Sequence, residues 1–281
     1  MSRREEVLVT TEWAAEHLDD PAYRFVEVDE DTEAYGQGHL RGAIAWNWRS
    51  DLHKAPRRDF IDAEGTVELL RAAGVGPDTT VVLYGGNNNW FAAYAYWLLR
   101  YRGFDRVRLV DGGRKKWELE GRELVTDVPS PAPAEPGALG PERPELRAFR
   151  DDVLAHIDAP GKSLLDVRSP AEFTGEVLAP PHLPQEAAQV PGRVPGAANV
   201  PWASVAREDG TFKSNEELTA LYSEKGVTPD TEVIAYCRIG ERSSHSWFVL
   251  HELLGYPKVR NYDGSWAEYG SLVGVPIAIG E

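Results

Sequence analysis

Cysteine is almost absent from this sequence: Cys237 is the only one among 281 residues. A single thiol excludes an internal disulfide and any zinc site built from cysteines. The chain also has no uninterrupted apolar run of the roughly 18–20 residues that a membrane helix needs. Its first residues, MSRREEVLVTTEW, lack the apolar core of a secretory signal. We therefore expect a cytoplasmic protein that does not associate with membranes.

Positive charge is scarce as well, because 45 acidic residues stand against 30 lysines and arginines, for a formal net charge of −15. A chain this acidic repels the phosphate backbone, so we expect no nucleic-acid partner. The seven histidines are dispersed and show no spacing typical of metal ligands, so we predict neither a metal nor a cofactor. A small anionic substrate has to be captured by local charge, against the field of the whole chain.

The chain contains an internal repeat. GVGPDTTVVLYGG, beginning at Gly74, aligns without a gap with GVTPDTEVIAYCR, beginning at Gly226, an offset of 152 residues. The same offset pairs VRLVDGG, beginning at Val107, with VRNYDGS, beginning at Val259. A period this long indicates two copies of one domain and not a solenoid.

Other matches locate an insertion in the second copy. FVEVDE at Phe25 aligns with LLDVRS at Leu164, an offset of 139, and GHLRGA at Gly38 aligns with GRVPGA at Gly192, an offset of 154. The offset therefore grows within the proline-rich stretch 176–192, which we expect to be a surface loop. The sequence does not reveal the role of this loop.

Proline also marks the boundary between the copies. The stretch TDVPSPAPAEPGALGPERPEL carries a proline at every second to fifth position, which disfavours helix and sheet interior alike. We predict an N-terminal domain at residues 1–128, a proline-rich linker at 129–146 and a C-terminal domain at 147–281.

Each copy alternates short β-branched runs with amphipathic stretches. TTVVLY and TEVIAY are both followed by a helical pattern, and then by another short apolar run that ends in an Asp-Gly turn. This alternation predicts an α/β fold in which a mainly parallel sheet is flanked by helices. In the second copy we expect Ser243 and Ser244 to cap the helix and Gly255 to end it.

The lone cysteine follows a predicted strand and precedes a predicted helix. Amides at such a junction point outward and favour an anion, and Arg238 and Arg242 add positive charge beside Cys237. We expect a thiolate held by the loop amides, with Arg242 reaching over the loop to hold an oxyanion. A small buried hydrophobe is the alternative reading of a lone cysteine, but an inert thiol does not need flanking cations. The first copy has Gly85 at this position, so we interpret it as structural.

The spacing of cysteine and arginine bears on the substrate. Tyrosine phosphatases use Cys-x5-Arg to cradle a phosphate, whereas Cys237 and Arg242 form Cys-x4-Arg, one residue shorter. A tighter loop suits one extra sulfur atom on the cysteine better than a tetrahedral phosphate.

Together, DVRSPAEF, GRVPGAANVPW, YCRIGERSSHSWFVL and VRNYDGSW resemble the two-domain rhodaneses, bacterial thiosulfate sulfurtransferases. The resemblance covers nearly the whole chain and implies two tandem rhodanese-like domains, of which the first is degenerate. It implies that Cys237 attacks the outer sulfur of thiosulfate, keeps that sulfur as a persulfide and passes it to an acceptor. The implied substrate-binding residues are those of the loop and an arginine after an earlier strand: Arg238, Ile239, Gly240, Glu241, Arg242, Ser243 and Arg168.

Three of these expectations have open alternatives. Arg168 either contacts substrate or forms an ion pair with Asp166 or Glu172. Glu241 is expected to face solvent or to pair with an arginine. His245, inside the predicted helix, is expected to pack or cap and not to act as a base.

Two other functions stay open. One is the transfer of sulfur from 3-mercaptopyruvate. Enzymes with that activity typically have a glycine- and serine-rich loop after the cysteine, such as Cys-Gly-Ser-Gly, whereas the loop here, CRIGER, is charged. The other is a non-catalytic persulfide carrier or sensor. Cyanide, a thiol such as glutathione, and thioredoxin are all candidate acceptors, and the sequence does not decide among them.

Overall fold

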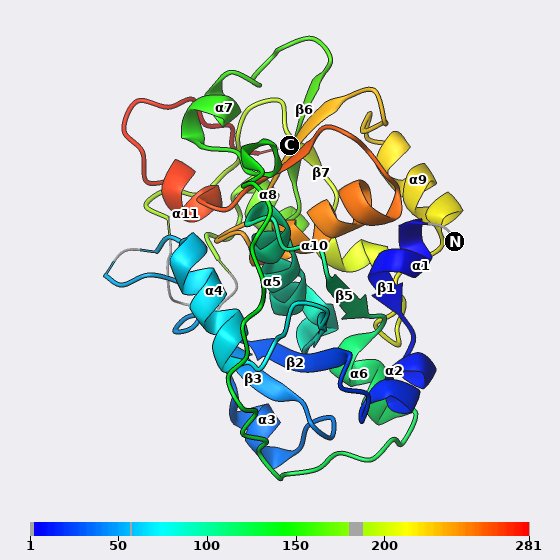
Figure 1. Ribbon diagram of the computed structural model, residues 1–281. Helices are drawn as coiled ribbons and strands as arrows, with labels where there is room; N and C mark the ends of the chain where they lie inside the picture. The colour runs from blue at the N-terminus through cyan, green and yellow to red at the C-terminus, as the bar shows by residue number, and fades with distance from the viewer. Residues whose placement is uncertain (1–2, 57, 180–187, 281) are drawn as a thin grey trace. The chain divides into compact units, whose positions relative to one another are not determined.

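The computed structural model describes residues 3–56, 58–179 and 188–280. The chain divides into two compact units, Met1–Arg143 with Ala206–Phe212, and Pro144–Val205 with Lys213–Glu281. Each unit is an α/β domain built on a parallel sheet, as the sequence predicts (Figure 1). Residues 180–187 of the insertion 176–192 lie outside the described residues. In the described part of the chain, no helix is long and apolar enough to cross a membrane.

The first unit contains a five-stranded parallel sheet in the order β1-β5-β4-β2-β3. Its strands are β1 (Leu8–Val9), β2 (Tyr23–Asp29), β3 (Ile44–Asn47), β4 (Thr80–Tyr84) and β5 (Val107–Val110). Its helices are α1 (Arg3–Val7), α2 (Thr11–His17), α3 (Glu33–Gln37), α4 (Ala63–Ala72), the short 3-10 turn η1 (Asn87–Asn89), α5 (Trp90–Tyr101) and α6 (Gly113–Leu119).

Helices cover both faces of this sheet. Val82 and Tyr84 on β4 pack into one cluster with Ala14 of α2 and Trp117 of α6. Alternate residues of a strand point to opposite faces, and α5 packs on β2, β4 and β5. Burial on both faces explains why β4 is a continuous apolar run and not an alternating one.

The second unit repeats this plan with a four-stranded parallel sheet in the order β7-β6-β8-β9. Its strands are β6 (Lys162–Asp166), β7 (Ala198–Asn199), β8 (Glu232–Tyr236) and β9 (Val259–Tyr262). Its helical elements are η2 (Pro144–Leu146), α7 (Arg150–Leu154), α8 (Pro170–Thr174), η3 (Trp202–Val205), α9 (Asn215–Ser223), α10 (Glu241–Trp247), its π-helical continuation η4 (Phe248–Leu253), and α11 (Ser265–Tyr269).

The repeat offsets are visible in the strands. β8 and β9 begin 152 residues after β4 and β5, while β6 begins 139 residues after β2. The counterpart of β1 is reduced to a single parallel bridge between Arg147 and Asn261.

The proline-rich stretch packs against the first unit. Residues 129–143 contain no helix or strand, but Glu135 binds Arg71 at 3.0 and 3.1 Å, and Arg143 binds Asp105 at 2.7 and 2.8 Å. The first compact unit ends at Arg143 and the second begins at Pro144, and the segment Ala206–Phe212 also belongs to the first. The boundaries 1–128, 129–146 and 147–281 stay a prediction.

Two buried carboxylates lie at the end of β2 in the first unit. Arg114 donates to both oxygens of Glu27, at 2.8 and 3.0 Å. The side chain of Asp29 has no such cation in the described structure and accepts a hydrogen bond from the backbone N–H of Gly86 at 2.8 Å. Burial, reinforced by the charge of Glu27, raises the pKa of Asp29 to about 7. The folded first unit therefore binds a proton at Asp29 more tightly than the unfolded chain does.

We expect Asp29→Asn to stabilise the protein at pH 8 by roughly 1–3 kcal/mol, and to give no such gain near pH 4. Since the folded pKa is raised, the stability that Asp29 contributes is present below the unfolded value near 4 and is lost as the pH rises through about 7. Asparagine keeps an acceptor for Gly86 and never ionises. Thermal unfolding at both pH values measures the gain, with the exposed Asp78→Asn as the matched control. A gain that does not change with pH contradicts the assignment.

Candidate active site

Cys237 is the first residue after β8, at the carboxyl edge of the second sheet. Four residues, Cys237 to Gly240, connect the strand to α10 and are all buried. α10 begins at Glu241, so the prediction that Ser243 and Ser244 cap this helix is wrong. Gly240 holds the cap position with φ +102°, and a Cβ there would lie 2.8 Å from Cα of Asp263. Only glycine fits this turn without strain, which is why the loop can close so tightly.

The sulfur atom is enclosed by polar groups of the loop. The backbone N–H of Gly240 donates to Sγ at 3.1 Å, and the hydroxyl of Ser243 approaches Sγ at 3.6 Å. On another side, Sγ lies 3.4 Å from Oε2 of Glu241, where the thiol donates to the carboxylate. These contacts make a cradle that contains both donors for an anionic sulfur and a full negative charge.

A strained serine holds the backbone of Cys237. Ser265 has φ +53°, and its Oγ accepts the backbone N–H of Cys237 at 3.0 Å and donates to the carbonyl of Tyr262 at 2.7 Å. Its counterpart in the first copy is Gly113, with φ +54°. Positive φ in a serine costs free energy, and here it places a hydroxyl under Cys237. Sequence reasoning missed Ser265, although a serine that replaces the glycine of the other copy was a usable signal.

Arg242 makes a buried ion pair. Its Nη1 and Nη2 donate to the two oxygens of Glu172 at 3.0 and 3.1 Å, and Nε lies 3.6 Å from Oε1 of Glu241. Burial alone would raise the pKa of Glu172, but the hydrogen bonds and charge of Arg242 bring that pKa below its usual value. In this arrangement Arg242 is held by Glu172, and the expectation that it reaches over the loop to hold an oxyanion stays a prediction. Sequence reasoning named Glu172 only as a partner for Arg168.

Arg168 is also fully engaged. It is 1% exposed, and its guanidinium donates to Asp166 at 2.5 to 3.1 Å and to the carbonyl of Gly192 at 2.7 Å. Of the two alternatives for Arg168, the ion pair with Asp166 is the one present. The remaining predicted loop residues, Arg238 and Ile239, are 3% and 1% exposed.

Two expectations concern charge near the thiol, and one of them is wrong. Glu241 does not face solvent, because it is 1% exposed and contacts both Cys237 and Arg242, so only the expected pairing with an arginine is confirmed. The thiol is not activated by its flanking cations in this arrangement. Burial, followed by the charge of Glu241, raises the pKa of Cys237, and Arg242 only partly opposes them. His245 is buried and packs edge-on against Trp202, with ring centroids 5.5 Å apart.

The first unit has no space for a thiol at the position that corresponds to Cys237. A Cβ on Gly85, the counterpart of Cys237, would overlap the carbonyl oxygen of Val28. The counterpart of Glu241 is Asn89, whose side chain accepts the N–H of Gly85 at 2.9 Å and donates to the carbonyl of Val110 at 2.7 Å. An amide that binds backbone therefore occupies the cradle of the first unit.

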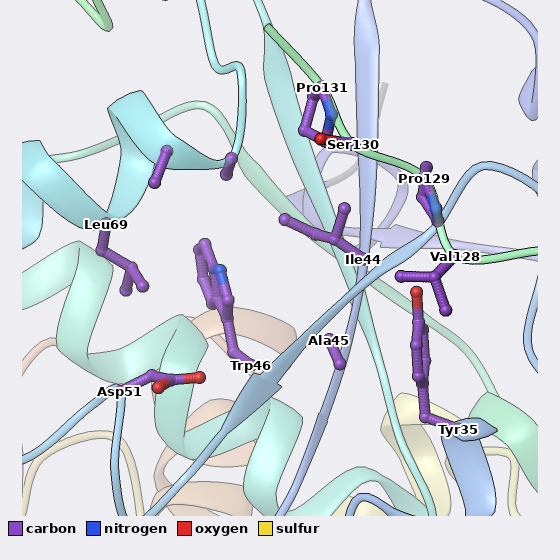
Figure 2. A pocket seen from close by; sticks show the side chains of 12 residues that line it. Tyr35, Ile44, Ala45, Trp46, Asp51, Leu69, Val128, Pro129, Ser130 and Pro131 are labelled. Atoms are coloured by element: carbon purple, nitrogen blue, oxygen red, sulfur yellow. The ribbon is translucent and has the colours of Figure 1, made fainter. Parts of the chain in front are cut away.

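The first unit has a pocket of about 470 Å³ beside β3 and α4. Val128 to Pro131 line one side of it, and Trp46 and Leu69 line another (Figure 2). Among the lining residues the carboxylate is Asp51, which accepts the backbone N–H of Asn47 at 2.7 Å. The described lining residues include no thiol and no cation, so they offer no group for sulfur chemistry. Among the described residues, no cluster of three or more histidine, cysteine or acidic side chains could hold a metal.

Comparison with known proteins assigns both units to one domain type. Residues 10–120 and 149–272 each match the Rhodanese-like domain. The chain is 59% identical over 275 residues to a Saccharopolyspora erythraea protein named "Putative thiosulfate sulfurtransferase", covering 98% of this chain and 96% of the relative. It is 55% identical over 280 residues to the "Sulfur carrier protein TtuD" of Thermus thermophilus, covering 98% of both chains.

A solved structure shows the same fold over nearly the whole chain. A variant of EanB, described as a cysteine persulfide in a tetrahedral intermediate state with ergothioneine, superimposes with a TM-score of 0.86 at 26% identity. The match covers 99% of this chain and 72% of that one.

Proposed function

Because the chain belongs to the rhodanese-like family, with two copies of its domain, we propose that it is a sulfurtransferase that carries sulfur from thiosulfate on Cys237. The observation that carries the proposal is the position of the sole thiol, at the carboxyl edge of a parallel sheet, with the N–H of Gly240 and the hydroxyl of Ser243 directed at its sulfur. The names of the relatives support sulfur transfer as the activity.

The reaction is a double displacement. Because Sγ is fully buried at rest, the thiol loses its proton to water that enters with the donor. The thiolate of Cys237 then attacks the outer sulfur of thiosulfate. The sulfur–sulfur bond of thiosulfate breaks, sulfite leaves with the bonding pair, and a Cys237 persulfide anion remains. A nucleophilic acceptor then attacks the outer sulfur of the persulfide: cyanide leaves as thiocyanate, and a thiol leaves as a persulfide. The Cys237 thiolate is regenerated in either case.

The loop residues have distinct roles in this scheme. Gly240 and Ser243 supply hydrogen bonds to the anionic sulfur, and Ile239 closes the cradle against water. Arg238 and Arg242 supply positive charge for the sulfonate, with Arg242 oriented by Glu172. Arg168 acts as a positioning residue, because its ion pair with Asp166 fixes the end of β6.

A sulfur carrier that is charged by another protein is the second candidate. The 55% identity to a protein named as a sulfur carrier favours it, and so does a thiol that is fully buried with a raised pKa. Transfer from 3-mercaptopyruvate is a variant of the enzymatic proposal. The acceptor, including thioredoxin, and the cytoplasmic location remain predictions from the sequence.

Intact mass after incubation with a donor separates these functions. We expect excess thiosulfate to add one sulfur atom to the protein, and cyanide to remove it with release of thiocyanate. If the protein gains sulfur from 3-mercaptopyruvate but not from thiosulfate, 3-mercaptopyruvate is the donor. A gain with neither, alongside a gain from a persulfidated partner such as a cysteine desulfurase, assigns the carrier function.

A further inference from the structure

The carboxylate of Glu241 lies against the reactive sulfur. Its Oε2 is 3.4 Å from Sγ of Cys237, and its Oε1 is 3.6 Å from Nε of Arg242. Glu241 is 1% exposed, so water does not screen this charge effectively. A carboxylate at this distance opposes a second negative charge on the sulfur and also opposes an anion that approaches it.

The charge of Arg242 opposes this effect only in part. Arg242 faces Glu241 but places both of its terminal nitrogens on Glu172 of α8, so one cation is shared between two carboxylates. Beyond β9, Asp263 is bound by Arg147 at 2.9 Å through both oxygens. Arg238 is the other cation of the loop, and Ser243 and Ser265 bring neutral hydroxyls to the sulfur.

The first copy shows what the fold itself requires at this position. Asn89 replaces Glu241 there and binds backbone on both sides through its amide. The first unit therefore closes its loop with a neutral side chain at this position, one methylene shorter than glutamate. The domain type does not require a carboxylate here, so the charge of Glu241 calls for a functional explanation.

We propose that Glu241 is a specificity-determining residue, whose charge keeps Cys237 as the thiol at rest and makes the site favour sulfur donors of low negative charge. The inference rests on the proposed sulfur transfer through Cys237. A donor with one negative charge meets less repulsion from Glu241 than the dianion thiosulfate does. The resting thiol is in turn protected from oxidants and alkylating agents, which react with the thiolate.

Two donors that differ by one charge test the proposal. Thiosulfate is a dianion, and methanethiosulfonate is a monoanion that also gives up its outer sulfur, with a sulfinate as the leaving group. We expect Glu241→Gln to raise kcat/KM for both donors, by roughly tenfold for methanethiosulfonate, since a fall of about one unit in the thiol pKa gives ten times more thiolate for either donor. The gain for thiosulfate should be about threefold larger still, because only the dianion carries the additional charge that Glu241 repels. Glu224→Gln, on the exposed end of α9, is the matched control and should change neither value.

A second measurement reports the protonation state of the resting thiol and needs no sulfur donor. The rate of alkylation by iodoacetamide, an uncharged probe, is followed against pH for the wild type and Glu241→Gln. We expect the midpoint to fall by about one unit in the variant, because a neighbouring negative charge has been removed. Glu241→Ala should shift the midpoint in the same direction, which covers the case in which the glutamine variant fails to fold.

The outcomes are separable. An unchanged donor ratio together with an unchanged alkylation midpoint overturns the proposal. Folded Glu241→Gln protein that loses loading by both donors also overturns it, because the carboxylate would then be needed for the reaction. If the wild type accepts sulfur from neither donor, the proposed function fails. The alkylation midpoint still decides whether Glu241 holds the resting thiol.

Discussion

Cys237→Ser should abolish sulfur loading, with transfer from thiosulfate to cyanide falling by roughly 10³–10⁶-fold, as expected when a nucleophile is removed. A serine hydroxyl has almost the shape of the thiol and fits the same cradle, so the hydrogen bond from Gly240 persists. The variant should therefore fold normally and still fail to gain a sulfur atom. Intact mass after thiosulfate treatment and thiocyanate release measure the two steps separately.

The contradicting result is easily recognised. Because Cys237 is the only cysteine, sulfur gained by the serine variant cannot sit on another thiol. Residual thiocyanate formation at near wild-type rate would mean that the reaction does not pass through a persulfide of this protein. Thermal unfolding of both proteins checks that the loss is chemical and does not come from unfolding.

Arg242→Met should produce the second large effect, a destabilisation of about 3–5 kcal/mol, because it leaves a buried carboxylate without its cation. Glu172, 1% exposed, would keep only the Ser169 backbone N–H and hydroxyl at the start of α8. Adding Glu172→Gln should restore about 1–3 kcal/mol, since glutamine is neutral and still caps the helix. Chemical denaturation of both single variants and the double variant gives the coupling free energy.

The same variants separate the stability role of Arg242 from its role in donor binding. We expect the double variant to fold but to keep a kcat/KM for thiosulfate at least about 10²-fold below wild type, because the positive charge is still missing. Recovery of activity together with stability would show that Arg242 acts only through its ion pair. Additive stability losses would show that the two residues are not coupled.

Much of the architecture was predictable from the sequence, because the repeat carries strand and helix patterns at fixed offsets. β4 and β8 coincide with the two β-branched runs, and Gly255 ends the second-copy helix with φ +70°, as expected. The position of Cys237 between strand and helix was equally legible. These features depend on local periodicity and on turn chemistry, which a sequence shows directly.

The electrostatics of the site were not predictable in the same way. The two arginines next to Cys237 in the sequence predict a thiolate. In the folded protein, however, Glu172 of α8 binds Arg242, and the carboxylate of Glu241 points inward to the sulfur. Arg168 and Asp166 are two residues apart, so their pairing could at least be named as an alternative. The Arg242 partner is 70 residues away, and only the tertiary fold identifies it.

The crowding at Gly85 limits how the first domain can change over evolutionary time. Two of the four glycine codons become cysteine codons through one nucleotide substitution. At this site the new side chain would overlap the carbonyl of Val28, and the amide of Asn89 already occupies the cradle. A thiol cradle in the first domain therefore needs coordinated changes in a strand end and a loop, which a single mutation at Gly85 does not provide.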